Sequence, residues 1–335
     1  MALCNIDLRV GEARVIRDIT CKLFDLDQIT AQSALSDWEY HSNGYRPLVQ
    51  CLEQKHEAPI IITNGANHAL HACMYALRAL HCQNMGIRIP YWSRIPEIAR
   101  LIGINYTPFQ GALVSSADLG IDSLLLTLPN NPDGFIPSSE ILHNGLEALR
   151  NAKIPVIHDA VYYTRSYLPV DYPILSIGDA QIFSASKSYG LSSLRVGYIV
   201  VYNKELLKPL QEFVEISTVG VSILSQKLFL HILTREMQLP FLRDNFVKST
   251  REELNRTKNI FKKADSNKVE LPVDFDKSGG MFAWVKPKKI DLFEKIKVDV
   301  LHGNMFGMPG YVRINLAAGA DLITEVVKRI NNFTD

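Results

Sequence analysis

The sequence predicts an α/β fold, with a mostly parallel seven-stranded sheet in a large domain and a smaller α+β domain beside it. Short apolar runs alternate with helical patterns between residues 59 and 202, and this alternation is typical of a parallel sheet covered by helices on both faces. Most of the runs are continuously apolar, as strands buried on both faces require. From about residue 204 onward the pattern changes to long helices followed by a few strands.

The seven expected strands are read from these apolar runs, at residues 60–63, 87–90, 104–107, 123–129, 155–159, 181–186 and 196–202. Between the first two, Leu70, Met74, Leu77 and Leu80 recur at helical spacing. A second helix is expected after Pro137, because the serines that follow suit the N-terminal cap of a helix. These helices supply the crossover connections that parallel strands need.

The second part of the chain predicts a different kind of domain. Long helical patterns run to about residue 265, strand-like segments follow at 269–275, 281–287 and 311–317, and a helix closes the chain near 321–332. We therefore expect a large domain of residues 41–225 and a small domain that combines residues 1–40 with 226–335.

Composition narrows the class of protein. Hydrophobic residues make up 47% of the 335 positions, enough for a large globular core. Lys plus Arg number 36 and Asp plus Glu 35, giving a net charge of +1 that predicts no attraction to nucleic acid or to a membrane surface. The five cysteines show no CxxC spacing, and no apolar stretch of about 18 residues occurs. We expect reduced thiols and a cytoplasmic protein.

Polar or unusual residues follow the ends of several expected strands. In open α/β sheets, ligands bind at the carboxyl ends of the strands. Taken singly, each of these residues has an ordinary structural explanation as a turn, a helix cap, a core aromatic or a solvated charge. Their shared position predicts one ligand site, formed by Gly65, Trp92, Asn131, Asp159 and Lys187.

Five motifs carry a resemblance to a known family. They are "SASKSYGLSSLRVGY" (184–198), "NNPDG" (130–134), "DAVY" (159–162), "TNGANHAL" (63–70) and the pair "GGMFAWV" and "YVRINLA". Together they cover most of the chain from about residue 40; the lysine motif is the strong signal, and "TNGANHAL" alone would be a weak one. The set resembles the class I/II aminotransferases, which are fold-type I enzymes that use pyridoxal 5′-phosphate. The resemblance implies that cofactor, a homodimer, and amino-acid and keto-acid substrates.

The resemblance assigns chemistry to the residues around the cofactor ring. Lys187 would form a Schiff base with the cofactor aldehyde, which requires a neutral amine favoured by burial and nearby positive charge. Asp159 would pair with the pyridinium nitrogen and keep the ring an electron sink. Asn131 and Tyr162 would hydrogen-bond the phenolic oxygen, and Trp92 would stack on the ring face.

Further residues are implied for the phosphate and the substrate. Gly65, Ala66 and Asn67 lie at a helix start, where free N–H groups favour an anion; Ser184 adds a hydroxyl and Arg195 a bidentate pair. Arg313 would clamp the substrate α-carboxylate, together with Asn131. Tyr40 resembles a tyrosine that reaches the partner subunit's site, and the alternative of a core aromatic stays open.

The sequence departs from the family pattern at several points. Ala160 and Asp133 replace residues common in the motifs, and only 29 positions separate Trp284 from Arg313, so the small domain is trimmed. We expect an aminotransferase that works through Lys187; a decarboxylase, lyase or cyclase with the same cofactor site is the alternative. A ligand-sensing domain is disfavoured because no helix-turn-helix extension is visible. His68 and His71 lack partners that would complete a metal site.

Overall fold

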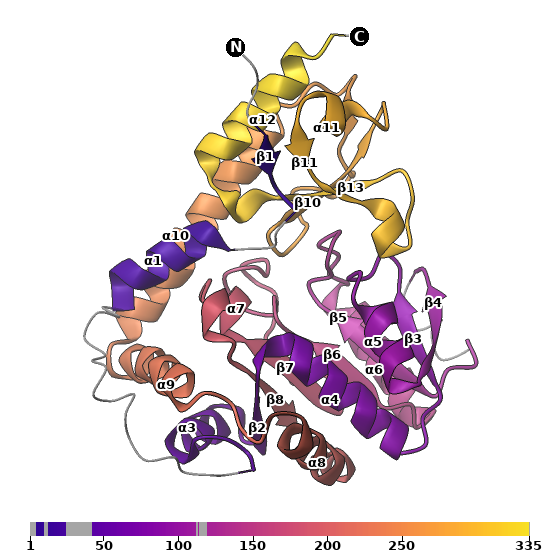
Figure 1. Ribbon diagram of the computed structural model, residues 1–335, viewed down its shortest axis with the longest axis vertical. Coiled ribbons are helices and arrows are strands. Elements are labelled where there is room, and N and C mark those ends of the chain that lie inside the picture. Colours follow the sequence, from indigo (N-terminus) through magenta and orange to yellow (C-terminus); the bar gives the residue numbers. More distant parts are fainter. Residues whose placement is uncertain (1–4, 10–12, 25–41, 112, 114–118, 335) are drawn as a thin grey trace.

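The computed structural model describes residues 5–9, 13–24, 42–111, 113 and 119–334. At its centre is a seven-stranded sheet in the order β2-β8-β7-β6-β5-β3-β4 (Figure 1). Only β8 runs antiparallel to its neighbours, so the prediction of a mostly parallel α/β sheet is confirmed. The strands are β2 (Ile60–Thr63), β3 (Asn84–Arg88), β4 (Asn105–Phe109), β5 (Ser123–Thr127), β6 (Val156–Asp159), β7 (Ala180–Ser184) and β8 (Gly197–Val201).

The two faces of this sheet are buried under different parts of the chain. On one face, Leu125 and Ile157 pack in a cluster with side chains of α4 (Gly65–Ala79), α5 (Ile95–Ile102) and α8 (Leu207–Thr218). On the other, Leu124 and Leu126 pack with α6 (Ser139–Asn151) and with the segment 163–177. Burial on both faces explains why most of the strands are largely apolar, whereas the edge strand β4 is mostly exposed. The sheet is thereby a rigid base for residues at its carboxyl edge.

The second domain is built on a four-stranded antiparallel sheet in the order β12-β13-β10-β9. These strands are β9 (Val269–Glu270), β10 (Phe282–Pro287), β12 (Leu301–His302) and β13 (Val312–Asn315), and α12 (Ala320–Asn332) packs on them, with the short α11 (Leu292–Lys295) nearby. The N-terminal strand β1 (Ile6–Asp7) pairs in parallel with β11 (Val298–Asp299). β1 thus lies with the small domain, whereas Ile16 and Phe24 belong to the core of the large domain, and the assignment of residues 1–40 to the small domain stays a prediction.

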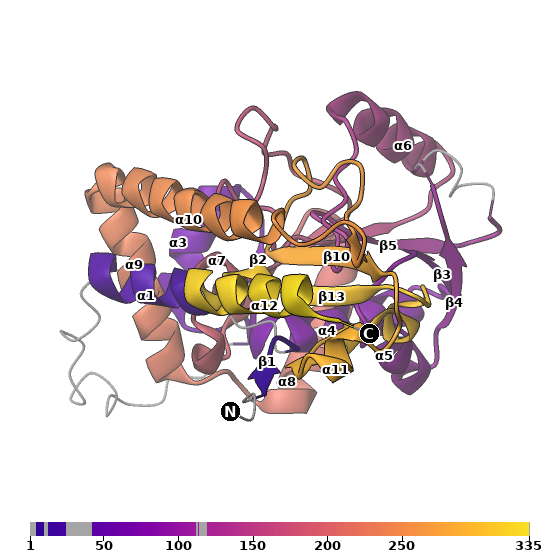
Figure 2. The same ribbon diagram turned by 90° about the horizontal axis from the view of Figure 1, so that it is seen from above.

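The remaining helices include one, α10, that reaches the cores of both domains. They are α1 (Arg14–Phe24), α3 (Arg46–His56), α7 (Ala185–Ser188), α9 (Ile223–Gln238) and α10 (Pro240–Phe261). Figure 2 shows α1 and α12 lying along α10. Phe246 of α10 belongs to the core of the large domain and Phe261 to that of the small domain. Phe229 and Ile232 of α9 also pack in the large-domain core, while the boundary at residue 225 stays a prediction.

Two observations bear on the environment of the protein. Among the described residues, no helix combines the length and apolar character needed to cross a membrane. Cys21, Cys51, Cys73 and Cys82 are free thiols.

Candidate active site

A cavity of about 420 Å³ lies at the carboxyl edge of the seven-stranded sheet, facing the small domain. Its lining brings together ten of the predicted residues: Ala66, Asn67, Trp92, Asn131, Asp159, Tyr162, Ser184, Lys187, Arg195 and Arg313. Gly65 contacts the Arg195 guanidinium at the edge of this lining. Tyr40 lies outside the described residues. Leu70, Val161, Ser192 and Phe282 also line the cavity and were not predicted.

Lys187 sits in the single helical turn α7, which follows β7. Ser184 caps this turn, since its hydroxyl accepts a hydrogen bond from the Ser186 backbone N–H at 3.2 Å. The Tyr167 hydroxyl donates to the Lys187 carbonyl oxygen at 2.7 Å. The backbone that carries the lysine is therefore fixed on both sides of the side chain.

The chain leaves this turn against the N-terminal helix α1. Gly190 has a φ of +70°, and a Cβ added there would lie 2.3 Å from the Arg17 backbone nitrogen, so only glycine fits at this position. The Thr20 hydroxyl, also on α1, donates to the Tyr189 carbonyl at 2.7 Å. The glycine of the lysine motif thus serves a close approach between α1 and the lysine turn.

Asp159 ends β6 and is only 5% exposed. Its Oδ1 accepts a long hydrogen bond of 3.4 Å from the Val161 N–H. Burial raises the pKa of Asp159 to about 7, although the Val161 N–H and the charge of Lys187 act in the opposite direction. A carboxylate in this position favours a cationic N–H donor as its partner.

Arg313, on β13 of the small domain, reaches across to the large domain. Its Nη1 donates to the Asn131 Oδ1 at 3.0 Å and its Nη2 donates to the Arg9 carbonyl at 2.9 Å. The guanidinium lies over the Phe282 ring, 4.1 Å from its centroid. Burial lowers the pKa of Arg313 to about 10, and among the described residues no carboxylate pairs with it.

This geometry suits a carboxylate ligand. A buried guanidinium without a counter-ion is unfavourable, and a planar guanidinium binds a carboxylate through two parallel hydrogen bonds. Because the Asn131 Oδ1 is engaged by Arg313, its amide nitrogen is left for a ligand in the cavity. The contact with Arg9 could not be predicted, since a backbone carbonyl leaves no signal in the sequence.

The N-terminus of α4 forms a cradle for an anion. Asn64, at the cap position, makes no side-chain capping hydrogen bond, so the first N–H groups of the helix are available. Gly65 has a φ of +76°, and a Cβ there would lie 2.6 Å from the Arg195 Nη2. The absence of a side chain at Gly65 thus allows Arg195 to lie against the start of the helix.

Asp133, one of the departures from the family pattern, has a structural role. Its carboxylate pairs with Arg88 at 2.8 Å and accepts hydrogen bonds from the Asn130 side chain at 2.7 Å and the Phe135 N–H at 3.1 Å. Both charged side chains are largely buried. The aspartate therefore fixes the turn that presents Asn131.

The family assignment follows from a comparison with known proteins. A family model described as "Aminotransferase class I and II" matches residues 34–330. The chain belongs to this family. The resemblance noted in the sequence is thereby confirmed, and class I and II aminotransferases are transferases that depend on pyridoxal phosphate.

Individual relatives agree with this assignment. The chain is 32% identical to tryptophan aminotransferase-related protein 2 of Arabidopsis thaliana over 171 residues, which cover 50% of this chain and 36% of the relative. It is 25% identical to an aspartate aminotransferase of Thermotoga maritima over 300 residues, covering 82% and 75%. The match to the Arabidopsis related protein 4 covers 63% of that protein, so the chain spans only part of the plant relatives' length.

Solved structures agree on the fold. The crystal structure of aspartate aminotransferase from Thermotoga maritima superposes with a TM-score of 0.78 at 19% identity, covering 98% of this chain and 92% of that one. A Leishmania infantum tyrosine aminotransferase gives a TM-score of 0.79 at 16% identity, covering 98% and 90%. At these identities the likeness shows the fold-type I architecture of this aminotransferase-family chain.

The residues present fit the cofactor of this family. The Ser186 hydroxyl is buried without a hydrogen-bond partner among the described residues, and it lines the same cavity as Lys187. The start of α4 and Arg195 suit a phosphate, and the buried Asp159 suits a protonated ring nitrogen. The cavity therefore brings together the amine of Lys187, a buried carboxylate that suits a cationic partner, and a helix N-terminus that suits an anion.

Proposed function

We propose that this chain is a pyridoxal-phosphate-dependent aminotransferase that moves an amino group between an amino acid and a keto acid. One observation carries the proposal: Lys187 of the large domain and the buried Arg313 of the small domain line the same cavity. A lysine amine is the group that holds a cofactor aldehyde, and a guanidinium without a counter-ion is the group that holds a substrate carboxylate. The reacting Cα would lie between them.

Different residues around the cavity would bind the phosphate, the ring face and the ring nitrogen of the cofactor. The N–H groups at Gly65, Ala66 and Asn67 would take the phosphate, with Ser184 and Arg195 as further donors. Trp92 would stack on the ring. Asp159 would accept from the ring nitrogen, which would restore a low pKa to its carboxylate. When bound, the cofactor supplies an electron sink for negative charge at the substrate Cα.

Proton transfer falls to Lys187. With cofactor and substrate bound, the Lys187 Nζ would remove the proton from the substrate Cα as a general base. Tyr167 and the Ser184 cap hold the backbone of this lysine in place. Arg313 and Asn131 orient the substrate carboxylate, and Tyr162, which is buried in the same lining, would donate to the phenolic oxygen.

The proposed oligomeric state, location and reaction type each rest on a separate observation. A homodimer is proposed because the family places its sites at a subunit interface, and Tyr40 would reach the partner's site in such an assembly. A cytoplasmic location is proposed because the described cysteines are free thiols. None of the relatives named above is a decarboxylase, lyase or cyclase, so that alternative has no support among them.

A donor–acceptor screen tests the proposed reaction. Protein loaded with pyridoxal phosphate is mixed with single amino acids, beginning with aspartate and tryptophan because relatives carry those names. We expect the cofactor absorbance to shift to that of its amine form and to return when a keto acid is added. Release of carbon dioxide without this shift, or no reaction with any donor, would reject transamination.

A further inference from the structure

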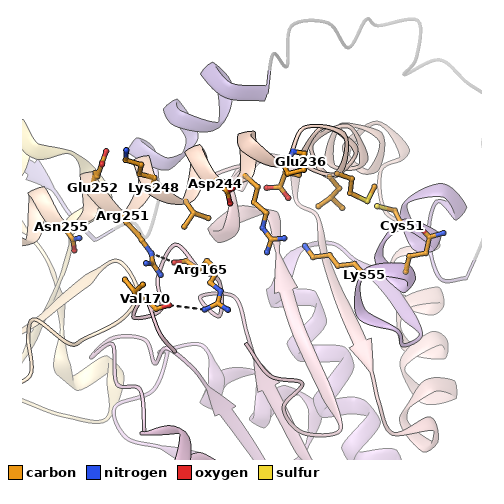
Figure 3. Close-up of a pocket in the computed structure, with 16 residues that line it drawn as sticks. Cys51, Lys55, Arg165, Val170, Glu236, Asp244, Lys248, Arg251, Glu252 and Asn255 are labelled. Carbon is orange, nitrogen blue, oxygen red and sulfur yellow. Dashed lines mark hydrogen bonds between the residues drawn. The ribbon is translucent and has the colours of Figure 1, made fainter. Parts of the chain in front are cut away.

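A second cavity, of about 940 Å³, lies apart from the candidate active site (Figure 3). It is bounded by α3, the C-terminal end of α9, α10 and the segment 165–170, and it shares no lining residue with the active-site cavity. Its volume is in the range of sites that hold small organic molecules. Nothing in the proposed aminotransferase reaction uses it.

One face of α10 forms a wall of this cavity. Arg243, Val247, Lys248 and Arg251 line it, and residues three or four positions apart lie on the same side of a helix. Leu242, Phe246 and Thr250, on the adjoining face of the helix, are buried. The charged face of α10 is therefore directed into the cavity, while its apolar face packs on the protein.

Positive charge exceeds negative charge in the lining. The basic residues are Lys55, Arg165, Arg243, Lys248 and Arg251, and the acidic ones are Glu236, Asp244 and Glu252. Among the described residues, none of the five basic side chains forms an ion pair. Glu236 accepts a hydrogen bond from the Tyr189 hydroxyl at 2.9 Å. Burial raises the pKa of its carboxyl, and the charges of Lys55 and Arg243 act in the opposite direction.

Two guanidinium groups are held close together at one side of the cavity. The Arg251 Nε donates to the Arg165 carbonyl at 2.6 Å and its Nη2 to the Leu168 carbonyl at 2.9 Å. The Arg165 Nη1 donates to the Tyr172 carbonyl at 2.8 Å. These acceptors are neutral. Burial and the charge of Arg165 lower the pKa of Arg251, while the charge of Asp171 acts in the opposite direction. Figure 3 shows both side chains in the lining.

We propose that this cavity binds a small molecule whose phosphate or carboxylate groups lie against Arg165, Arg251 and the neighbouring cations of α10. Guanidinium groups already fixed by carbonyls keep their planes oriented, which favours bidentate binding of an oxyanion. Arg243 and Lys248 extend the positive surface along the helix, so a ligand with at least two negative charges fits better than a monoanion.

The site adjoins the segment that supports the catalytic lysine. Arg251 holds the carbonyls of Arg165 and Leu168, and Tyr167 lies between these two residues and donates to the Lys187 carbonyl. The anion site depends on the charges around α10 and does not require that the chain performs transamination.

Isothermal titration calorimetry tests this proposal. The protein is first loaded with pyridoxal phosphate, so that the anion cradle at α4 is occupied, and unbound cofactor is removed. It is then titrated with pyrophosphate or with citrate. We expect binding of at least one probe, weakened by added salt. The double variant R243Q/K248Q should bind about tenfold more weakly or worse, because it removes two cations. Binding of one probe only supports the site and identifies the ligand as phosphorylated or as a polycarboxylate.

The matched control is R256Q, which also removes a positive charge from α10. Arg256 does not line the cavity and pairs with Glu253, so this variant should bind the probe as the unmodified protein does. Circular dichroism confirms that each variant is folded. The proposal is overturned if neither probe binds, if R243Q/K248Q binds unchanged, or if R256Q loses affinity to the same extent.

Discussion

The two cavities differ in how far their arginines are exposed to solvent. In the candidate active site, Arg313 is 4% exposed, lies over the Phe282 ring and is fixed by Asn131 and Arg9. Beside α10, Arg243 is exposed to solvent in an open, mixed-charge wall. A buried cation is tolerated only where its geometry is satisfied, whereas an exposed one acts mainly through its charge. The first cavity is therefore built for one ligand geometry, and the second for a class of anions.

The largest loss of activity is expected from Asp159→Asn. The amide cannot carry the negative charge that would keep a bound ring nitrogen protonated, so turnover should fall by about 10²- to 10³-fold. Steady-state kinetics with the best donor–acceptor pair measures this loss. Asp274→Asn, which neutralises an exposed carboxylate paired with Lys277, should leave turnover unchanged. Equal rates for Asp159→Asn and the unmodified protein would remove Asp159 from the proposed site.

Arg313→Lys should have a smaller effect. A lysine keeps the charge but cannot form two parallel hydrogen bonds, and it loses the contact with Asn131. We expect kcat/KM for the amino acid to fall about 10- to 100-fold, mainly through KM, since hydrogen bonds to charged groups contribute about 1.5–3 kcal/mol. Affinity for the cofactor, measured by equilibrium dialysis, should be retained. An unchanged KM would place the substrate carboxylate elsewhere.

The pH dependence of the free energy of unfolding, measured on the cofactor-free protein, tests the raised pKa of Asp159 independently of catalysis. Its folded pKa of about 7 lies above the ordinary value of 3.8, so the folded state favours the protonated form. The resulting stability is present below about pH 4 and is lost as the pH rises through about 7. Between pH 6 and pH 8 the loss should be on the order of 1 kcal/mol.

Urea unfolding at these two pH values measures that loss. Asp159→Asn keeps the size of the side chain and cannot titrate, so the variant should lose less stability than the unmodified protein over the same interval. If both proteins lose the same amount, Asp159 does not titrate as its burial indicates.

The smallest effect is expected from Asp133→Thr. Threonine keeps an acceptor in the turn but leaves the largely buried Arg88 without its ion pair. The free energy of unfolding should fall by about 1 kcal/mol, with little change in turnover. A double-mutant cycle with Arg88→Gln measures the coupling between the two side chains. Additive effects would show that the pair does not stabilise the turn that carries Asn131.

The sequence could predict the parts of the molecule that depend on local patterns. The seven strands of the large sheet could be predicted because burial on both faces makes most of them largely apolar, although their ends differ from the predicted ones by a few residues. Asn131, Asp159 and Lys187 could be placed together because each follows a strand of that sheet. The strands β1 and β11, two residues long each, are too short to leave such a pattern.

Contacts between distant segments could not be predicted. The Arg9 carbonyl that binds Arg313 and the Lys187 carbonyl that binds Tyr167 involve backbone groups that every residue carries. The role of Asp133 was also missed, because its partner Arg88 lies on another strand. These contacts depend on the assembled fold, and they determine how firmly the predicted residues are held.

The central claim is that Lys187 holds the cofactor, and borohydride reduction followed by peptide mass mapping tests it most directly. After loading with pyridoxal phosphate and reduction, the pyridoxyl group should be found on the peptide that contains Lys187. Lys187→Ala should lose the reducible link while remaining folded. Modification at another lysine instead, or a reducible link that persists in Lys187→Ala, would contradict the account.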